Sequence, residues 1–313
     1  ARLRGEDQGL DHWSQGAWVA LTEHRAIAAA LAIQGHHVGL QRANTDALRR
    51  MNPQSLTQNH PFRLALSDSD CTRLKQRAEA EGVLFQMPAQ TTLPHQNSMA
   101  QAVSAMLDVR LLFSCLVDAD FLDTESHFEG DAQGKRPRPE GPKLDASAAL
   151  AALDAHMVAL RGATGAQVAV RQARETLWSA VICASQAKSG TFTLTAPTGS
   201  GKTLAMLKFA LEHAGKHGLK RVILAVPFLT VIEQTARIYR TVFNASQDNF
   251  VLEHHSLAGL GAEAEQRDAE GINERQRRLL AENWDAPIVL TTNVQLLESL
   301  FSNRPSSCRK LNN

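Results

Sequence analysis

The chain has 313 residues, of which 43% are hydrophobic and 21% are charged, and its formal net charge is +1. This composition is typical of a soluble globular protein, the length suffices for two domains, and the charge balance by itself predicts neither a nucleic-acid nor a membrane partner. The four cysteines form no CxxC pair, which argues against a disulfide framework or a cysteine-based zinc site. No apolar stretch approaches the roughly 20 residues of a membrane span and no signal peptide is evident, so we expect a cytoplasmic protein.

The first part of the chain, residues 1–125, is expected to be mostly helical. Its apolar spacing predicts one helix over Ala17–Gln34, ending at Gly35, and a long helix over Asn97–Glu125. Between them, residues 50–96 are rich in Pro, Gln, Asn and Ser and should form short helices joined by loops.

Two features of this part suit a metal ion. His36 and His37 are adjacent, and neighbouring side chains of a regular helix point about 100° apart, so they could share a metal only near a helix end. Gly35 and Gly39 make such an end plausible, although a chance pair among twelve histidines is the simpler interpretation. The second feature is a mostly apolar predicted helix that carries three carboxylates, Asp118, Asp120 and Asp123. Any of these carboxylates that is buried needs a partner.

The middle of the chain changes character. Residues 127–143 combine Pro, Gly and many charges, which predicts a loop or linker, and Ala146–Leu160 resumes helical spacing. From about residue 165 onward, predicted strands alternate with predicted helices, a pattern typical of a parallel α/β sheet.

The most informative segment is TFTLTAPTGSGKT, residues 191–203. We expect a strand over Thr191–Thr195 and a helix after the loop that Gly215 can end. Glycines let successive N–H groups face phosphates, a lysine supplies positive charge, and a threonine hydroxyl can ligate Mg²⁺. The alternative is a Gly-rich turn without a ligand. We predict ATP or GTP binding with Mg²⁺ by Thr198, Gly199, Ser200, Gly201, Lys202 and Thr203.

Further segments flank this loop in an informative order. Gln172 lies about one helix upstream, and its amide could read adenine. Residues 221–236 predict a buried strand that ends at Pro227 and turns into a helix, and residues 283–301 predict another buried strand. Thr291 and Thr292 fall at the carboxyl end of that strand, where α/β sheets bind ligands, and hydroxyl groups suit a nucleic-acid backbone. The alternative is that this polar group merely caps the next helix.

Residues 165–313 resemble the first RecA-like domain of a superfamily 2 helicase. TAPTGSGKT, VPFLTVIEQTA, VLEHHS and TTNVQLLESLF resemble the CRISPR-associated helicase–nuclease of type I systems most closely. The resemblance implies an α-helical HD-type domain remnant over 1–125, a linker and connecting helix over 126–164, and an α/β RecA-like domain with a parallel sheet over 165–313. It also implies ATP-driven 3′-to-5′ translocation on single-stranded DNA, recruitment by a Cascade-type surveillance complex, nuclease activity and a role in antiviral defence.

By the same resemblance, Gln172 corresponds to the adenine-reading Q motif, Thr198–Thr203 to the nucleotide loop, and Thr291 and Thr292 to a DNA-contacting motif. The HD-type nuclease domain of this family holds a divalent transition metal. The positions that correspond to its metal ligands are His12 in the segment DHWSQGA, His36, His37 and Asp120. Asp118 is the alternative to Asp120.

Two motifs of the family do not occur in the chain: the Asp-Glu-x-x segment that holds Mg²⁺ and orients water, and the His-Asp dipeptide that names the HD domain. We therefore expect a fragment that binds ATP weakly, hydrolyses it negligibly and shows little nuclease activity. Two alternatives stay open. One is another superfamily 2 DNA helicase with an unrelated helical N-terminal domain, and the other is a non-catalytic nucleotide-binding adaptor.

Overall fold

The computed structural model describes residues 10–60, 62–66, 71–82, 98–130, 140–163, 168–243, 249–255 and 279–311. The chain divides into two compact units. Unit 1 comprises Ala1–Pro137 with Leu297–Asn313, and unit 2 comprises Arg138–Leu296. Each unit has its own buried apolar cluster, so each is described by itself.

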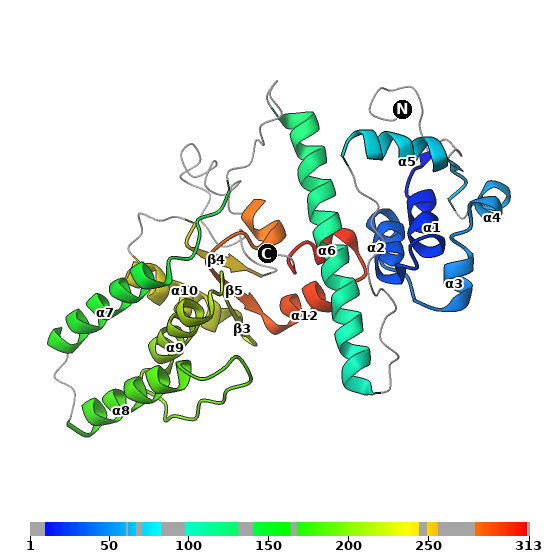
Figure 1. Cartoon of the computed structure of the whole chain (residues 1–313). Coiled ribbons are helices and arrows are strands. Elements are labelled where there is room, and N and C mark those ends of the chain that lie inside the picture. The colour runs from blue at the N-terminus through cyan, green and yellow to red at the C-terminus, as the bar shows by residue number, and fades with distance from the viewer. Residues whose placement is uncertain are drawn as a thin grey trace. The chain divides into compact units, whose positions relative to one another are not determined.

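Unit 1 is helical. Helix α2 (Ile27–Val38) lies between α1 (Ser14–Thr22) and α6 (Met99–Glu129), and its buried Ala30 and Leu31 belong to the unit's main apolar cluster (Figure 1). A short parallel pair of strands joins β1 (Leu10–Asp11) to β2 (Ala65–Leu66). The remaining helices of the unit are α3 (Thr45–Arg49), α4 (Pro53–Gln58), α5 (Cys71–Ala80) and α13 (Pro305–Cys308).

The predicted single helix over Ala17–Gln34 is wrong, because the chain turns between α1 and α2 through Arg25, which has a φ of 52°. Gly35 does not end α2 either. A Cβ built there would lie 3.1 Å from the Phe113 ring, so the glycine lets α2 approach α6 closely. The helix ends at Gly39, whose φ of 87° favours glycine. The histidine pair therefore lies in the last turn of α2.

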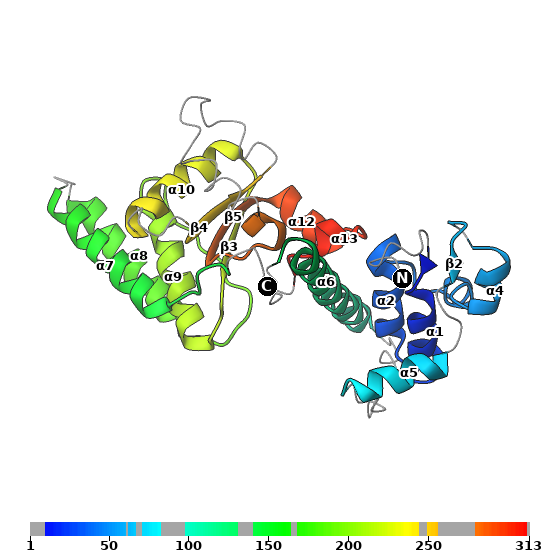
Figure 2. The same cartoon turned by 90° about the horizontal axis from the view of Figure 1, so that it is seen from above.

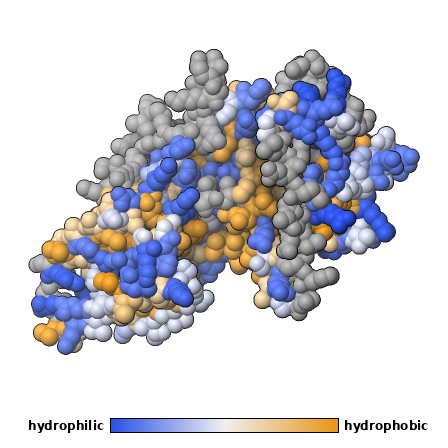
Figure 3. All heavy atoms as spheres, in the orientation of Figure 1, coloured by the Kyte–Doolittle hydropathy of each residue, from blue (hydrophilic) through white to orange (hydrophobic). Residues whose placement is uncertain are grey.

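Helix α6 confirms the predicted long helix and extends it to Glu129. The Ser98 hydroxyl accepts a hydrogen bond from the Gln101 N–H at its start. One face buries Val109, Phe113 and Val117, while other large apolar side chains of the helix stay exposed (Figure 3). Contrary to the sequence expectation, α6 is long and apolar enough to cross a membrane by length and composition alone. One such helix is weak evidence, because the core helix of a soluble protein passes the same test.

Unit 2 is an α/β unit. A parallel sheet has the strand order β3 (Val222–Val226), β5 (Ile288–Thr292), β4 (Val251–His254). Helices α7, α8 and α9 lie side by side (Figures 1 and 2). The helices of this unit include α7 (Ala146–Ala163), α8 (Val168–Ser185), α9 (Lys202–His217), α10 (Leu229–Phe243) and α12 (Asn293–Phe301), of which α12 continues into unit 1.

The two predicted later strands form, with one difference in burial. Strand β5 is central and buried, as its continuous apolar run predicts. Strand β3 has a neighbour on one side only among the described strands, and Ile223 is exposed, so the expectation of a fully buried strand is wrong there. Strand β4, which the sequence reading did not assign, pairs with the other edge of β5.

Two local expectations around the phosphate loop are also wrong. Thr191–Thr195 is exposed and forms no strand, since no described strand pairs with it, and β-propensity expresses fit to a sheet surface rather than a backbone preference. Helix α9 runs past Gly215 and ends at Gly218, whose φ of 64° is the left-handed conformation that stops helices.

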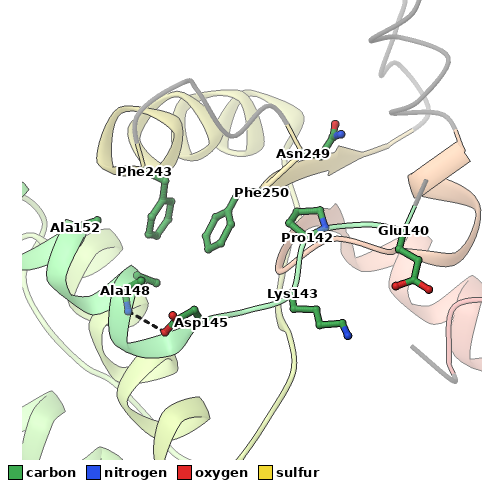
Figure 4. A pocket seen from close by; sticks show the side chains of 10 residues that line it. Glu140, Pro142, Lys143, Asp145, Ala148, Ala152, Phe243, Asn249 and Phe250 are labelled. Atoms are coloured by element: carbon green, nitrogen blue, oxygen red, sulfur yellow. Dashed lines mark hydrogen bonds between the residues drawn. The ribbon is translucent and has the colours of Figure 1, made fainter. Parts of the chain in front are cut away.

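Unit 2 also contains a pocket of about 490 Å³ between the start of α7 and the end of α10. The rings of Phe243 and Phe250 are 4.7 Å apart there, and the Asp145 carboxylate accepts a hydrogen bond from the Ala148 N–H (Figure 4). None of the residues predicted to bind nucleotide or DNA lines this pocket.

Candidate functional site

The backbone of the phosphate loop has the shape that its sequence predicts. Gly199 and Gly201 have φ values of 81° and 85°, and α9 begins immediately afterwards at Lys202. A Cβ at either glycine would meet nothing within 4 Å, so the backbone dihedral, and not lack of space, requires glycine. The first N–H groups of a helix lack partners within the helix, which makes the start of α9 suitable for an anion.

The side chains of the loop have partners within unit 2. Lys202 Nζ donates to the carbonyl oxygen of Ala196 at 2.7 Å, and Ser200 Oγ donates to that of Pro197 at 2.7 Å. The hydroxyl of Tyr239 in α10 donates to the Thr203 carbonyl at 3.3 Å. Burial raises the pKa of Tyr239, so the phenol stays neutral and remains a donor. These hydrogen bonds hold the loop in place. To bind a phosphate, the Lys202 ammonium has to give up only its hydrogen bond to the Ala196 carbonyl.

A second cation reaches the loop from α8. Gln172, the predicted adenine reader, is exposed on this helix. Two residues later, Arg174 Nη2 donates to the Gly199 carbonyl at 3.2 Å. Sequence reasoning missed Arg174, because nothing in the local pattern distinguishes it from the other charged residues of α8.

The two threonines predicted to contact DNA both have internal partners. Thr291 is fully buried, and its Oγ1 donates to the His254 carbonyl at 2.8 Å, which ties β5 to β4. Thr292 Oγ1 accepts from the Gln295 N–H at 3.1 Å and so supports the start of α12. The hydroxyl hydrogen of Thr292 can still be donated. Thr292 caps the start of α12, as the alternative interpretation of this segment predicts. A DNA contact stays a prediction for both Thr291 and Thr292.

In unit 1 the structure brings three of the four predicted metal residues together. Potential ligand atoms of His12, His36 and His37 all lie within 4.8 Å of one another. The Nε2 atoms of His12 and His37 are 2.9 Å apart, and His36 Nδ1 donates to the Ile33 carbonyl at 2.6 Å, which leaves its Nε2 for a ligand. The end of α2 at Gly39 makes the arrangement possible, because His36 and His37 occupy its last turn.

Burial favours a neutral His12. Partial removal of water from the ring lowers the pKa of His12 most, and the neighbouring His36 adds to the shift, while a hydrogen bond with the Leu10 backbone and the charges of Asp11 and Asp120 oppose it. A neutral imidazole is the form that binds metals. Asp120 is not a member of this group of potential ligands, and it acts on His12 through its charge.

The rival carboxylate, Asp118, has a structural partner. It is buried, and its Oδ1 accepts from Arg309 Nε at 2.9 Å. The Arg309 guanidinium also lies 4.6 Å from the centroid of the Phe121 ring. The partner that a buried aspartate on an apolar helix needs is thus an arginine almost 200 residues away in the sequence, which no local pattern reveals. This bond gives Asp118 a structural role, and the choice between Asp118 and Asp120 as a metal ligand stays a prediction.

A further carboxylate, Asp11, lies directly before His12 and is completely buried. Burial pushes the pKa of the Asp11 carboxyl upward, but hydrogen bonds from Ser14, His60 and Trp13 outweigh it and leave the pKa below its ordinary value. His60 donates from Nε2 at 2.9 Å. Sequence reasoning missed this pair, since 49 positions separate the two residues.

Comparisons with known proteins agree with the phosphate-loop geometry. Residues 167–308 match the family described as type III restriction enzyme, res subunit. The chain is 36% identical over 126 residues to a protein of Haloferax volcanii named CRISPR-associated nuclease/helicase Cas3. That match covers 36% of this chain and 13% of the relative, so the chain spans a small part of that protein's length. Residues 167–308 are thus similar to this family, and the match to the Cas3 protein confirms the resemblance to the CRISPR-associated helicase–nuclease that the motifs indicated.

Proposed function

We propose that this chain acts in an ATP-driven, single-stranded DNA helicase coupled to a metal-dependent nuclease of CRISPR antiviral defence. The observation that carries the proposal is the loop from Gly199 to Thr203, whose two left-handed glycines precede α9 inside residues 167–308, the region that matches the type III restriction enzyme family. The relative's name, nuclease/helicase, supports the combination of two activities. A cytoplasmic location and recruitment by a Cascade-type complex belong to the same proposal.

In unit 2, the loop would bind the phosphates of ATP. The N–H groups at the start of α9 would face the β- and γ-phosphates, and Lys202 would leave the Ala196 carbonyl for a phosphate oxygen. The Thr203 hydroxyl is the group that would hold Mg²⁺, which supplies charge neutralisation between the phosphates. Gln172 would read the adenine edge.

In unit 1, His12, His36, His37 and Asp120 would hold a divalent transition metal. Imidazole nitrogens with a carboxylate are a donor set suited to such ions, and the clustering of the three imidazoles supports the assignment. The metal would supply Lewis acidity and activation of water for phosphodiester cleavage. The residues themselves orient the donors, and a neutral His12 keeps its lone pair available.

Replacing His37 with alanine is expected to weaken Co²⁺ binding at least about 100-fold, because one of few nitrogen donors is lost. Isothermal titration of the full 313-residue chain with Co²⁺ measures this. His156→Ala, which removes an imidazole from α7 in unit 2, should bind Co²⁺ like the unchanged chain. Equal affinities for the His37→Ala and His156→Ala variants would contradict the proposed metal site.

The same Co²⁺ titration tests whether Asp120 or Asp118 is the carboxylate ligand, with asparagine variants of the two residues as a matched pair. Asp120→Asn should weaken Co²⁺ binding. Asp118→Asn should mainly lower stability, because it disturbs the bond to Arg309. The opposite pattern would assign the ligand to Asp118.

Replacing Thr292 with valine is expected to weaken single-stranded DNA binding about 5- to 10-fold, since one hydroxyl donor to a phosphate is worth about 1 kcal/mol. Fluorescence anisotropy of a labelled oligonucleotide measures the change. Thr292→Ser keeps the hydroxyl that accepts from the Gln295 N–H and should bind DNA normally. A Thr292→Val variant with undiminished DNA affinity would rule out the contact.

A further inference from the structure

A buried pair, Asp11 and His60, adjoins the histidine cluster of unit 1, because Asp11 directly precedes His12 in the chain. The side chain of His60 is 5% exposed and that of Asp11 is fully buried. The pair joins two separate segments of the chain, because Asp11 belongs to β1 and His60 precedes β2, with which β1 pairs in parallel. A buried carboxylate is costly unless hydrogen bonds satisfy it, so this arrangement is specific.

Asp11 fixes the backbone that follows His12. Its Oδ1 accepts from the N–H groups of Trp13 at 3.0 Å and Ser14 at 2.8 Å. Its Oδ2 accepts from Ser14 Oγ at 2.5 Å and from His60 Nε2 at 2.9 Å. The hydrogen bonds of the carboxylate therefore span the backbone of His12. The imidazole of His12 in turn contacts that of His37.

The hydrogen bonds of His60 define its tautomer. Its Nδ1 accepts from the Phe62 N–H at 3.1 Å, with a longer contact from the Leu64 N–H at 3.4 Å. A nitrogen that accepts carries no proton, so the proton of the ring lies on Nε2 and points at Asp11. His60 thus makes one bond that holds the Phe62 N–H and another that holds the carboxylate of Asp11, the residue directly before His12.

We infer that His60 is a positioning residue for the metal cluster, acting through Asp11 on the orientation of His12. The inference rests on the proposed metal role of His12, His36 and His37. Residues that orient metal ligands without touching the metal change its affinity about 10- to 100-fold when they are replaced. The chemical class of the ligand is a divalent transition metal held by imidazole nitrogens.

Two substitutions separate the two bonds of His60. The amide of an asparagine falls near Nδ1 and can accept from the Phe62 N–H, but it is too short to reach Asp11. The amide of a glutamine falls near Nε2 and can donate to Asp11. We expect His60→Asn to weaken Co²⁺ binding 10- to 100-fold and His60→Gln to stay within about threefold of the unchanged chain. A role confined to accepting the Phe62 N–H would produce the reverse order.

The measurement combines Co²⁺ titration of the full chain with the visible absorption of bound Co²⁺, which reports ligand geometry, and with thermal melting of the metal-free variants. A changed Co²⁺ spectrum in His60→Asn together with rescue by His60→Gln supports the inference. Wild-type affinity in a folded His60→Asn variant overturns it. If His60→Asn does not fold, His60→Gln decides alone: affinity within threefold supports the inference, and a tenfold loss overturns it.

His12→Ala serves as the reference for the metal site itself. If His12→Ala binds Co²⁺ as tightly as the unchanged chain, the proposed metal site fails and the role of His60 fails with it. If His12→Ala loses Co²⁺ while His60→Asn keeps it, only the positioning role fails. The two failures are therefore distinguishable.

Discussion

Replacing Lys202 with alanine is expected to weaken ATP binding about 10- to 100-fold while leaving the fold unchanged. A charge-assisted hydrogen bond to a phosphate contributes about 1.5–3 kcal/mol, which corresponds to this range. In the structure, Lys202 Nζ makes a bond to the Ala196 carbonyl in an exposed segment, so its loss costs the fold little. Titration with a fluorescent ATP analogue in the presence of Mg²⁺ measures the affinity, and thermal melting checks the fold.

Lys220→Ala is the matched control for this experiment, because Lys220 is an exposed lysine beyond the end of α9. It should bind the nucleotide normally. Lys202→Arg should not restore binding fully, since the larger planar guanidinium does not replace a compact ammonium inside a tight loop. Unchanged nucleotide affinity in Lys202→Ala would show that the loop from Gly199 to Thr203 is not the nucleotide site.

Replacing Arg309 with alanine is expected to destabilise unit 1 by about 3–5 kcal/mol, because it leaves the buried Asp118 carboxylate without the guanidinium that pairs with it. It also removes the cation from the face of the Phe121 ring. Hydrogen exchange resolved by peptide should show lower protection in α6 and unchanged protection in α9.

A second comparison isolates the ion pair. Lys75→Ala removes an exposed ion pair with Glu23 and should cost less than about 1 kcal/mol. Replacing both Asp118 and Arg309 with leucine should recover much of the stability that Arg309→Ala loses, since no unpaired charge stays buried. Normal protection of α6 in Arg309→Ala would contradict the structural role of the pair.

This structural role bears on the metal site. The sequence placed Asp118 and Asp120 on one apolar helix and could not choose between them. The bond from Arg309 occupies one oxygen of Asp118, while the charge of Asp120 acts on His12. A contact between residues far apart in the sequence thus separates two carboxylates that local spacing leaves equivalent.

Several elements followed from local sequence because all of their causes are local. The loop from Gly199 to Lys202 needs two glycines, a lysine and a following helix within a few residues, and the structure has all of them in order. Strand β5 and helix α6 followed from long apolar runs of the right period. The end of α9 was wrong by three residues, since both Gly215 and Gly218 could stop a helix and only the backbone conformation distinguishes them.

Other elements depended on partners that the sequence does not name. Thr191–Thr195 has strand composition, yet it forms no strand without a neighbouring strand to pair with. Gly35 reads as a helix end, whereas it serves the close packing of α2 against Phe113. A tertiary contact decided the role of Gly35, and the lack of a pairing strand among the described residues decided the conformation of Thr191–Thr195. Local propensity did not determine either outcome.

The sequence by itself determined the phosphate loop, the alternation of strands and helices that follows it, and the histidine pair near a glycine, because these features depend on residues close together in the chain. Only the tertiary structure brought His12 beside His37, paired Asp118 with Arg309, and paired His60 with Asp11. Those contacts join segments 25, 191 and 49 positions apart. Their physical cause is the packing of distant helices and the need of each buried charge for a partner.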